Sequence, residues 1–178
     1  SALFGHKRGA FTGASDDRPG FIRRAASGTL FLDEIAELPA AVQSRLLRVL
    51  ETKEIVPVGA DRGRIVDFRL VAATHNTLGQ RVEDGDFRAD LHARLAQMTI
   101  ELPPLAGRVE DLGILIKDIL NDSALQLDRA AAWAIVRCAW PQNIRQLVNA
   151  LNRAQALCED GTITLRHLPP EIVEQSQQ

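Results

Sequence analysis

The sequence predicts an α/β fold, with an incomplete parallel sheet flanked by helices over residues 1–105 and a small all-helical subdomain over 106–178. Two apolar runs, 28–36 and 68–74, each end on polar or acidic residues, which is typical of buried parallel strands. From about residue 109 such runs stop, and apolar residues repeat at helical spacing instead. All six Phe precede this point and both Trp follow it, so the composition changes there as well.

Local patterns predict each element in turn. The strand within 28–36 is followed by an amphipathic helix over about 40–51, because its apolar residues recur every three or four positions. Two short strands on either side of Asp61-Arg62-Gly63 indicate a hairpin. The remaining predictions are a strand over 68–74, a short helix over 87–95, a third strand over 98–102, and helices over 109–121, 128–139, 142–158 and 166–175.

Composition excludes several classes of protein. A net charge of −2 argues against a dedicated DNA-binding face, which is usually basic. Cys138 and Cys158 have no His or Cys partner at metal-ligand spacing, so we expect two reduced thiols. No stretch approaches the roughly 20 apolar residues that span a bilayer. The chain opens on Ser1 without a basic and apolar leader, so we expect a cytoplasmic protein cut from something longer, without membrane contact.

The most informative segment covers residues 9–14. Its glycines allow sharp turns, which would leave an aromatic ring and a hydroxyl at the tip of a loop. An exposed aromatic there favours contact with another molecule, although composition alone also fits an ordinary glycine-rich turn. The segment resembles the GAFTGA loop of bacterial enhancer-binding proteins, the AAA+ ATPases that remodel sigma-54 RNA polymerase. The resemblance assigns sigma-54 contact to Gly9, Ala10, Phe11, Thr12, Gly13 and Ala14.

Polar residues at the ends of two predicted strands fit the same family. Asp33-Glu34 resembles a Walker B element, in which Asp33 would orient the Mg²⁺ of a bound nucleotide and Glu34 would polarise the attacking water. Acid pairs also end many unrelated strands, so the pattern alone is weak. Thr74, His75 and Asn76 occupy the position of sensor I, which would sense the γ-phosphate. A lone His at a strand end is otherwise most often solvated.

Three arginines complete the resemblance. The segment 87–95 resembles the arginine-finger region, which acts on the nucleotide of a neighbouring subunit. Arg88 and Arg94 lie roughly 120° apart on a regular helix and cannot both reach one phosphate. We therefore assign Arg94 as the finger and Arg88 as a second interface arginine; surface salt bridges are the alternative. Arg145, within Trp140-Pro141-Gln142-Asn143-Ile144-Arg145, resembles the sensor II arginine of the lid.

The sequence departs from the family pattern at several positions. Gln142 replaces a Gly, so a turn with positive φ is expected to cost more. Gln146 replaces an acid, which removes a predicted salt-bridge partner. Ala106 replaces an arginine, and Arg23 stands where many members carry the Glu that couples the ATP site to the loop.

The chain contains no G-x-x-x-x-G-K-[ST] motif, so it lacks the cradle that holds nucleotide phosphates in this family. In the family, the strand that enters this cradle lies between the strand at 68–74 and the strand at 98–102. Without it two strand edges lose their partner, at about 1–3 kcal/mol for each unsatisfied group. We therefore expect the remaining strands to close the gap or another chain to supply an edge.

These observations predict part of a P-loop NTPase of the AAA+ type, ending in a helical lid. The implied function couples ATP hydrolysis to remodelling of sigma-54 RNA polymerase, with ATP, Mg²⁺ and sister subunits in a ring as partners and no direct contact with DNA. The alternative is a regulatory or protein-interaction module of the same family that no longer uses nucleotide. Other AAA+ branches, such as helicase loaders, lack the GAFTGA insertion.

Overall fold

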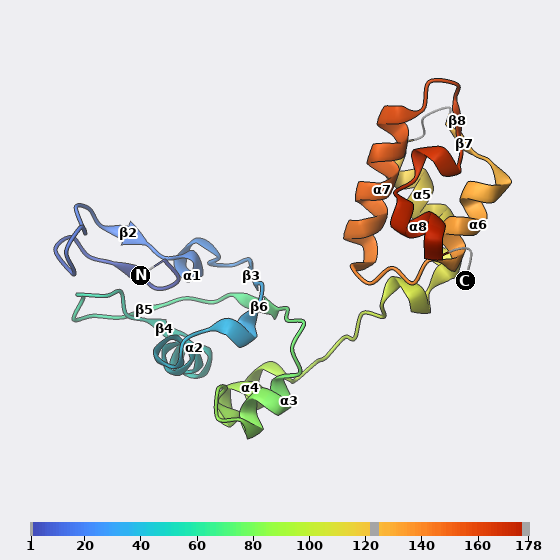
Figure 1. Ribbon diagram of the computed structural model, residues 1–178. Helices are drawn as coiled ribbons and strands as arrows, with labels where there is room; N and C mark the ends of the chain where they lie inside the picture. The colour runs from blue at the N-terminus through green and yellow to red at the C-terminus, as the bar shows by residue number, and fades with distance from the viewer. Residues whose placement is uncertain (1, 122–124, 176–178) are drawn as a thin grey trace. The chain divides into compact units, whose positions relative to one another are not determined.

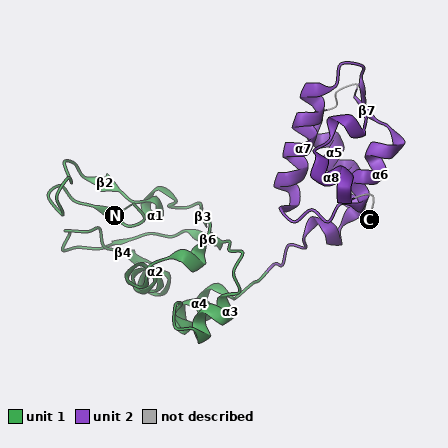
Figure 2. Cartoon of the chain, viewed as in Figure 1, with its two compact units in different colours: residues 1–99 green, residues 100–178 purple. Residues whose placement is uncertain are grey.

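The computed structural model describes residues 2–121 and 125–175, and the chain forms two compact units, Ser1–Thr99 and Ile100–Gln178 (Figure 2). The sequence places the boundary at 105/106, a few residues later. Each unit has its own apolar core of buried residues.

The first unit combines short strands with helices (Figure 1). Its elements are β1 (Gly5–His6), β2 (Arg18–Pro19), α1 (Phe21–Arg24), β3 (Thr29–Leu32), a 3-10 turn at Ile35–Glu37, α2 (Ala40–Thr52), β4 (Glu54–Ile55), β5 (Arg64–Ile65), β6 (Arg69–Ala72), α3 (Leu78–Glu83) and α4 (Ala89–Leu95).

Strands β3 and β6 pair in parallel, from Thr29 opposite Arg69 to Leu32 opposite Ala72. This pairing confirms the two predicted strands and brings their polar carboxyl ends to one edge. The predicted helix appears as α2, and the predicted hairpin appears as the antiparallel pair of β4 and β5. Helix α4 falls within the predicted 87–95.

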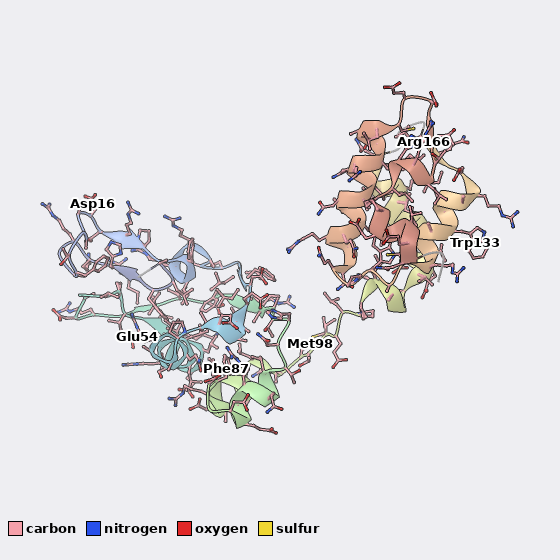
Figure 3. The ribbon with its side chains drawn as sticks, in the orientation of Figure 1. Asp16, Glu54, Phe87, Met98, Trp133 and Arg166 are labelled. Atoms are coloured by element: carbon pink, nitrogen blue, oxygen red, sulfur yellow. The ribbon has the colours of Figure 1, made fainter. Side chains whose placement is uncertain are left out.

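The prediction of a third strand over 98–102 is wrong. These residues form no strand, and the side chains of Met98, Ile100 and Leu102 are 76%, 70% and 82% exposed. Figure 3 shows Met98 in the extended segment beyond α4. The alternating apolar pattern is that of a strand, but within the described residues no neighbouring strand accepts its backbone groups. A strand forms only where such a partner exists, and the remaining strands do not close the gap.

The core of the first unit lies around α2, which buries Leu46, Leu47, Val49 and Leu50 on one side. Ile22 from α1, Ile55 from β4 and Leu91 from α4 pack into the same cluster. Helix α2 therefore shares one core with α1, β4 and α4.

The second unit is helical apart from one short parallel pair of strands. Its elements are 3-10 turns at Leu105–Gly107 and Val109–Asp111, α5 (Leu112–Ile119), β7 (Gln126–Leu127), α6 (Arg129–Arg137), α7 (Asn143–Leu157), β8 (Thr162–Ile163), a 3-10 turn at Leu165–His167 and α8 (Pro170–Gln175).

All four predicted helices are present, with shorter bounds. Helix α6 begins at the Asp128 cap, whose carboxylate accepts a hydrogen bond from the Ala131 amide. The predicted helix 166–175 is interrupted before Pro170, because proline fits the first turn of a helix but not its interior. Among the residues that the structure describes, no helix has both the length and the hydropathy to cross a membrane.

Candidate functional site

The loop at residues 9–14 is closed at its base by a polar clasp. The Lys7 ammonium and the Arg8 backbone N–H both donate to the Asp17 carboxylate, the latter over 2.8 Å. These hydrogen bonds, that of Lys7 above all, lower the pKa of Asp17 below its usual value. Within the loop the Gly9 N–H donates to the Ala14 carbonyl over 2.8 Å. Sequence reasoning missed the clasp, although a basic pair and an acidic pair flanking the loop were a visible signal.

The loop folds as a tight turn with its aromatic side chain outward. Gly9 and Gly13 have φ of +79° and +99°, a region that other residues rarely adopt. Phe11 is 45% exposed, and its ring meets the His6 ring edge-on at 4.9 Å between centroids. Thr12 is also exposed, whereas Ala14 is buried. The sequence therefore places an aromatic ring and a hydroxyl on the surface of a defined turn.

Strand β3 ends on the acid pair, and strand β6 ends close beside it. Glu34 adopts a left-handed conformation with φ of 50°, which turns its side chain toward the neighbouring strand end. His75 Nδ1 lies 2.8 Å and 2.9 Å from the two Glu34 carboxylate oxygens. Asp33 Oδ1 accepts only the adjacent Glu34 N–H, over 3.1 Å, among the described residues. The structure thus brings three predicted site residues together at one sheet edge.

The other two residues of the predicted sensor lie at the same edge. The Thr74 hydroxyl accepts the Asn76 N–H over 3.1 Å, and the Asn76 amide donates to Glu37 over 3.2 Å. Arg81 of α3 also donates to Glu37, which joins this edge to the helical segment that follows.

Carboxylates at this edge are the candidate ligands for a metal ion. Within the described residues, no group of three or more His, Cys, Asp or Glu side chains could hold a metal ion. The exposed Asp33 carboxylate fits the Mg²⁺ of a nucleotide, because Mg²⁺ commonly takes one or two carboxylates and completes its shell with phosphates and water.

The two candidate finger arginines have different partners. Arg88 immediately precedes α4 and donates two hydrogen bonds of 3.0 Å and 2.7 Å to the Asp90 carboxylate. These bonds raise the pKa of Arg88 and lower that of Asp90. Arg94 lies in the last turn of α4, exposed, and makes one 3.3 Å bond to the Leu50 carbonyl. Arg88 is thus held within its own chain, whereas the Arg94 guanidinium has one hydrogen-bond acceptor among the described residues.

Arg145 lies exposed in the first turn of α7, in the second unit, whereas every other candidate residue lies in the first. The prediction that Gln142 makes a turn with positive φ more costly is wrong. Gln142 has a φ of −104°, and the neighbouring residues with a left-handed backbone are Trp140 and Asn143. The Gln146 side chain accepts the Gln142 N–H over 3.3 Å, so it still stabilises the start of the helix.

Comparison with known families assigns both units. Residues 1–101 match the family described as the Sigma-54 interaction domain, and residues 107–178 match the AAA+ ATPase lid domain. The chain belongs to the sigma-54 interaction domain family. The AAA+ fold predicted from the GAFTGA-like loop and the strand ends is therefore confirmed, together with its lid.

Several relatives show how much of the whole proteins this chain represents. The nitric oxide reductase transcription regulator NorR1 of Cupriavidus necator is 46% identical over 165 residues, which cover 89% of this chain and 32% of NorR1. NtrC of Escherichia coli is 42% identical over 181 residues, covering 98% of this chain and 39% of NtrC. The crystal structure of NtrX from Brucella abortus in complex with ATP has a TM-score of 0.87 at 29% identity, covering 97% and 40%. This chain thus spans between a third and two fifths of these relatives.

Proposed function

We propose that this chain binds sigma-54 through the loop at residues 9–14, as part of an AAA+ module that couples ATP hydrolysis to remodelling of sigma-54 RNA polymerase. The observation that carries the proposal is the outward Phe11, 45% exposed on a turn that the clasp and two glycines hold in place. A large exposed aromatic on a defined loop is suited to fill a pocket on a partner.

The nucleotide would bind at the shared edge of β3 and β6. Asp33 would hold the Mg²⁺ that accompanies ATP, and Glu34 would orient the attacking water. His75 holds the Glu34 carboxylate in its position here, with 2.8 Å between His75 Nδ1 and Glu34 Oε1. Arg94 suits the finger role toward a sister subunit in a ring better than Arg88, because Asp90 already occupies the Arg88 guanidinium. Arg145 would sense the nucleotide from the lid.

The loop assignment is tested by titrating purified sigma-54 against the wild-type chain and Phe11→Ala. We expect the variant to bind at least about tenfold more weakly, since buried aromatic anchors contribute 1.4 kcal/mol or more to such contacts. Phe21→Ala is the matched control, because Phe21 is 51% exposed on α1, outside the loop. Equal loss in both variants, or no loss with Phe11→Ala, would contradict the assignment.

The second candidate function is a regulatory or interaction module that does not use nucleotide. The contact of Glu34 with His75 favours it, because the carboxylate that would orient the attacking water is already held by another side chain. Calorimetry with ATP and Mg²⁺ tests this second candidate, which predicts no micromolar binding by these 178 residues. Clear micromolar binding would mean that the described residues build a phosphate site, and it would rule the second candidate out. In both cases we propose a cytoplasmic protein whose segment here makes no direct DNA contact.

A further inference from the structure

Arg45, in the middle of α2, contacts two segments that support the loop. Its Nη2 donates to the Val56 carbonyl over 2.8 Å, just after β4. Its guanidinium lies over the Phe4 ring, with 4.1 Å from Cζ to the ring centroid. Phe4 is 3% exposed and immediately precedes β1, so one side chain joins α2 to the residue before β1 and to the segment that follows β4.

The segment after Val56 contacts the loop base directly. The Lys7 N–H donates to the Val58 carbonyl over 2.9 Å, and the Val58 N–H donates to the Gly5 carbonyl over 3.0 Å. Gly59, with φ of +76°, lies so close that an added Cβ would be 2.8 Å from the Ala10 Cβ. The hairpin of β4 and β5 therefore runs beside the N-terminal strands as a support for the loop (Figure 1).

The first turns of α2 are tied to the opposite side of the unit. Gln43, 1% exposed, donates to the carbonyls of Leu38 and Asp86 over 2.8 Å and 2.9 Å and accepts the Arg88 N–H over 2.9 Å. Leu38 belongs to the segment that follows the acid pair. Helix α2 thus contacts the segment after the acid pair through Gln43. Through Arg45 it contacts the two segments that support the loop.

We propose that Arg45 is a positioning residue that fixes the loop at residues 9–14 relative to α2, so that the orientation of Phe11 depends on this helix. The inference rests on the proposed function for the role of the loop, but the contacts themselves do not. A guanidinium is required because it stacks on a ring with its face and donates in its plane, whereas an ammonium is a single point charge. A lysine at this position would keep a positive charge over the Phe4 ring but could not also donate in the plane of a guanidinium to the Val56 carbonyl.

The matched variants are Arg45→Ala, Arg45→Lys and Arg48→Ala. Arg48 lines the same small cavity beside Phe4 and Val56, but its exposed guanidinium has no hydrogen-bonded partner among the described residues. Hydrogen–deuterium exchange of the wild type and each variant reports the amides of Lys7, Gly9 and Val58. Sigma-54 titration of the same proteins reports the consequence for binding.

We expect Arg45→Ala to raise the exchange rate about tenfold at the amides of Lys7, Gly9 and Val58. Arg45→Lys should raise this rate less, and Arg48→Ala should leave it unchanged. The amides of β3 and β6 should keep their wild-type exchange, which a general loss of structure would not allow. Wild-type exchange in Arg45→Ala, or an equal rise across the whole first unit, overturns the inference. If Arg45→Ala does not fold, the same criteria apply to Arg45→Lys.

The two proposals fail separately. If the wild-type chain does not bind sigma-54, the proposed function fails, while the exchange data still decide the positioning role. If Phe11→Ala weakens binding but both Arg45 variants bind as the wild type does, the loop assignment stands and the positioning role is wrong.

Discussion

The β3–β6 sheet of the first unit is covered less completely than the helical core of the second unit. In the second unit Trp140, Leu147, Leu151 and Ile163 are each at most 1% exposed, inside a cluster that α5, α6, α7 and α8 close together. In the first unit Phe31 of β3 is 59% exposed and Val71 of β6 is 40% exposed, although parallel sheets are usually covered on both faces. The core cluster of the second unit is enclosed by its helices, whereas the β3–β6 sheet leaves the face of Phe31 and Val71 open.

The difference follows from how each architecture satisfies its backbone. Helices make their hydrogen bonds internally, so a helical unit needs only side-chain packing to be complete. A parallel strand needs neighbours that are distant in sequence, and in the part of the chain that the structure describes β3 and β6 pair only with each other. The exposed segment around Met98 also lacks a neighbouring strand among the described residues. Its apolar residues alternate as they do in a strand, but the segment does not form one.

The largest expected effect tests the closed core. Trp140→Ala should destabilise the second unit by about 3–5 kcal/mol, because it removes a fully buried indole and its 2.9 Å hydrogen bond to the Ile135 carbonyl. Trp133→Ala is the control, because Trp133 is 55% exposed on α6 and its side chain points away from the helices (Figure 3). Its effect should stay within about 0.5 kcal/mol. Urea unfolding followed by circular dichroism measures the stability of both variants. Similar losses of stability would contradict the closed core around Trp140.

A smaller contrast is expected within a single strand. Leu30 is 8% exposed and faces α2, whereas its neighbour Phe31 points to the open face. Leu30→Ala should cost about 2–4 kcal/mol, and Phe31→Ala less than about 1 kcal/mol. Thermal unfolding of the two variants measures the difference. A large loss with Phe31→Ala would show that another surface covers this face in solution.

The sequence predicted the elements whose signals are local. The helical periodicity of α2, α6 and α7 and the polar ends of β3 and β6 were sufficient, because each depends on side chains close together in the chain. The strand at 98–102 could not be excluded in this way, because its pairing depends on a distant partner. The contacts of Arg45 with Phe4 and Val56 left no trace in the sequence either, since all three residues fit ordinary surface or core roles.

Family order predicted the loop, the acid pair and the sensor residues from the sequence, and the roles of these residues stay predictions. The contact of Glu34 with His75 was not predictable, because it depends on how two strand ends distant in sequence meet. The conformation at Gln142 was not predictable, because a change of residue type does not reveal which neighbour adopts the left-handed backbone.

The most direct test of the account is site-specific photo-crosslinking to sigma-54. A photoreactive phenylalanine analogue is placed at position 11 in one sample and at position 133 in another, both exposed aromatic sites but in different units. We expect a crosslink to sigma-54 from position 11 and none above background from position 133. A crosslink from position 133 without one from position 11 would contradict it.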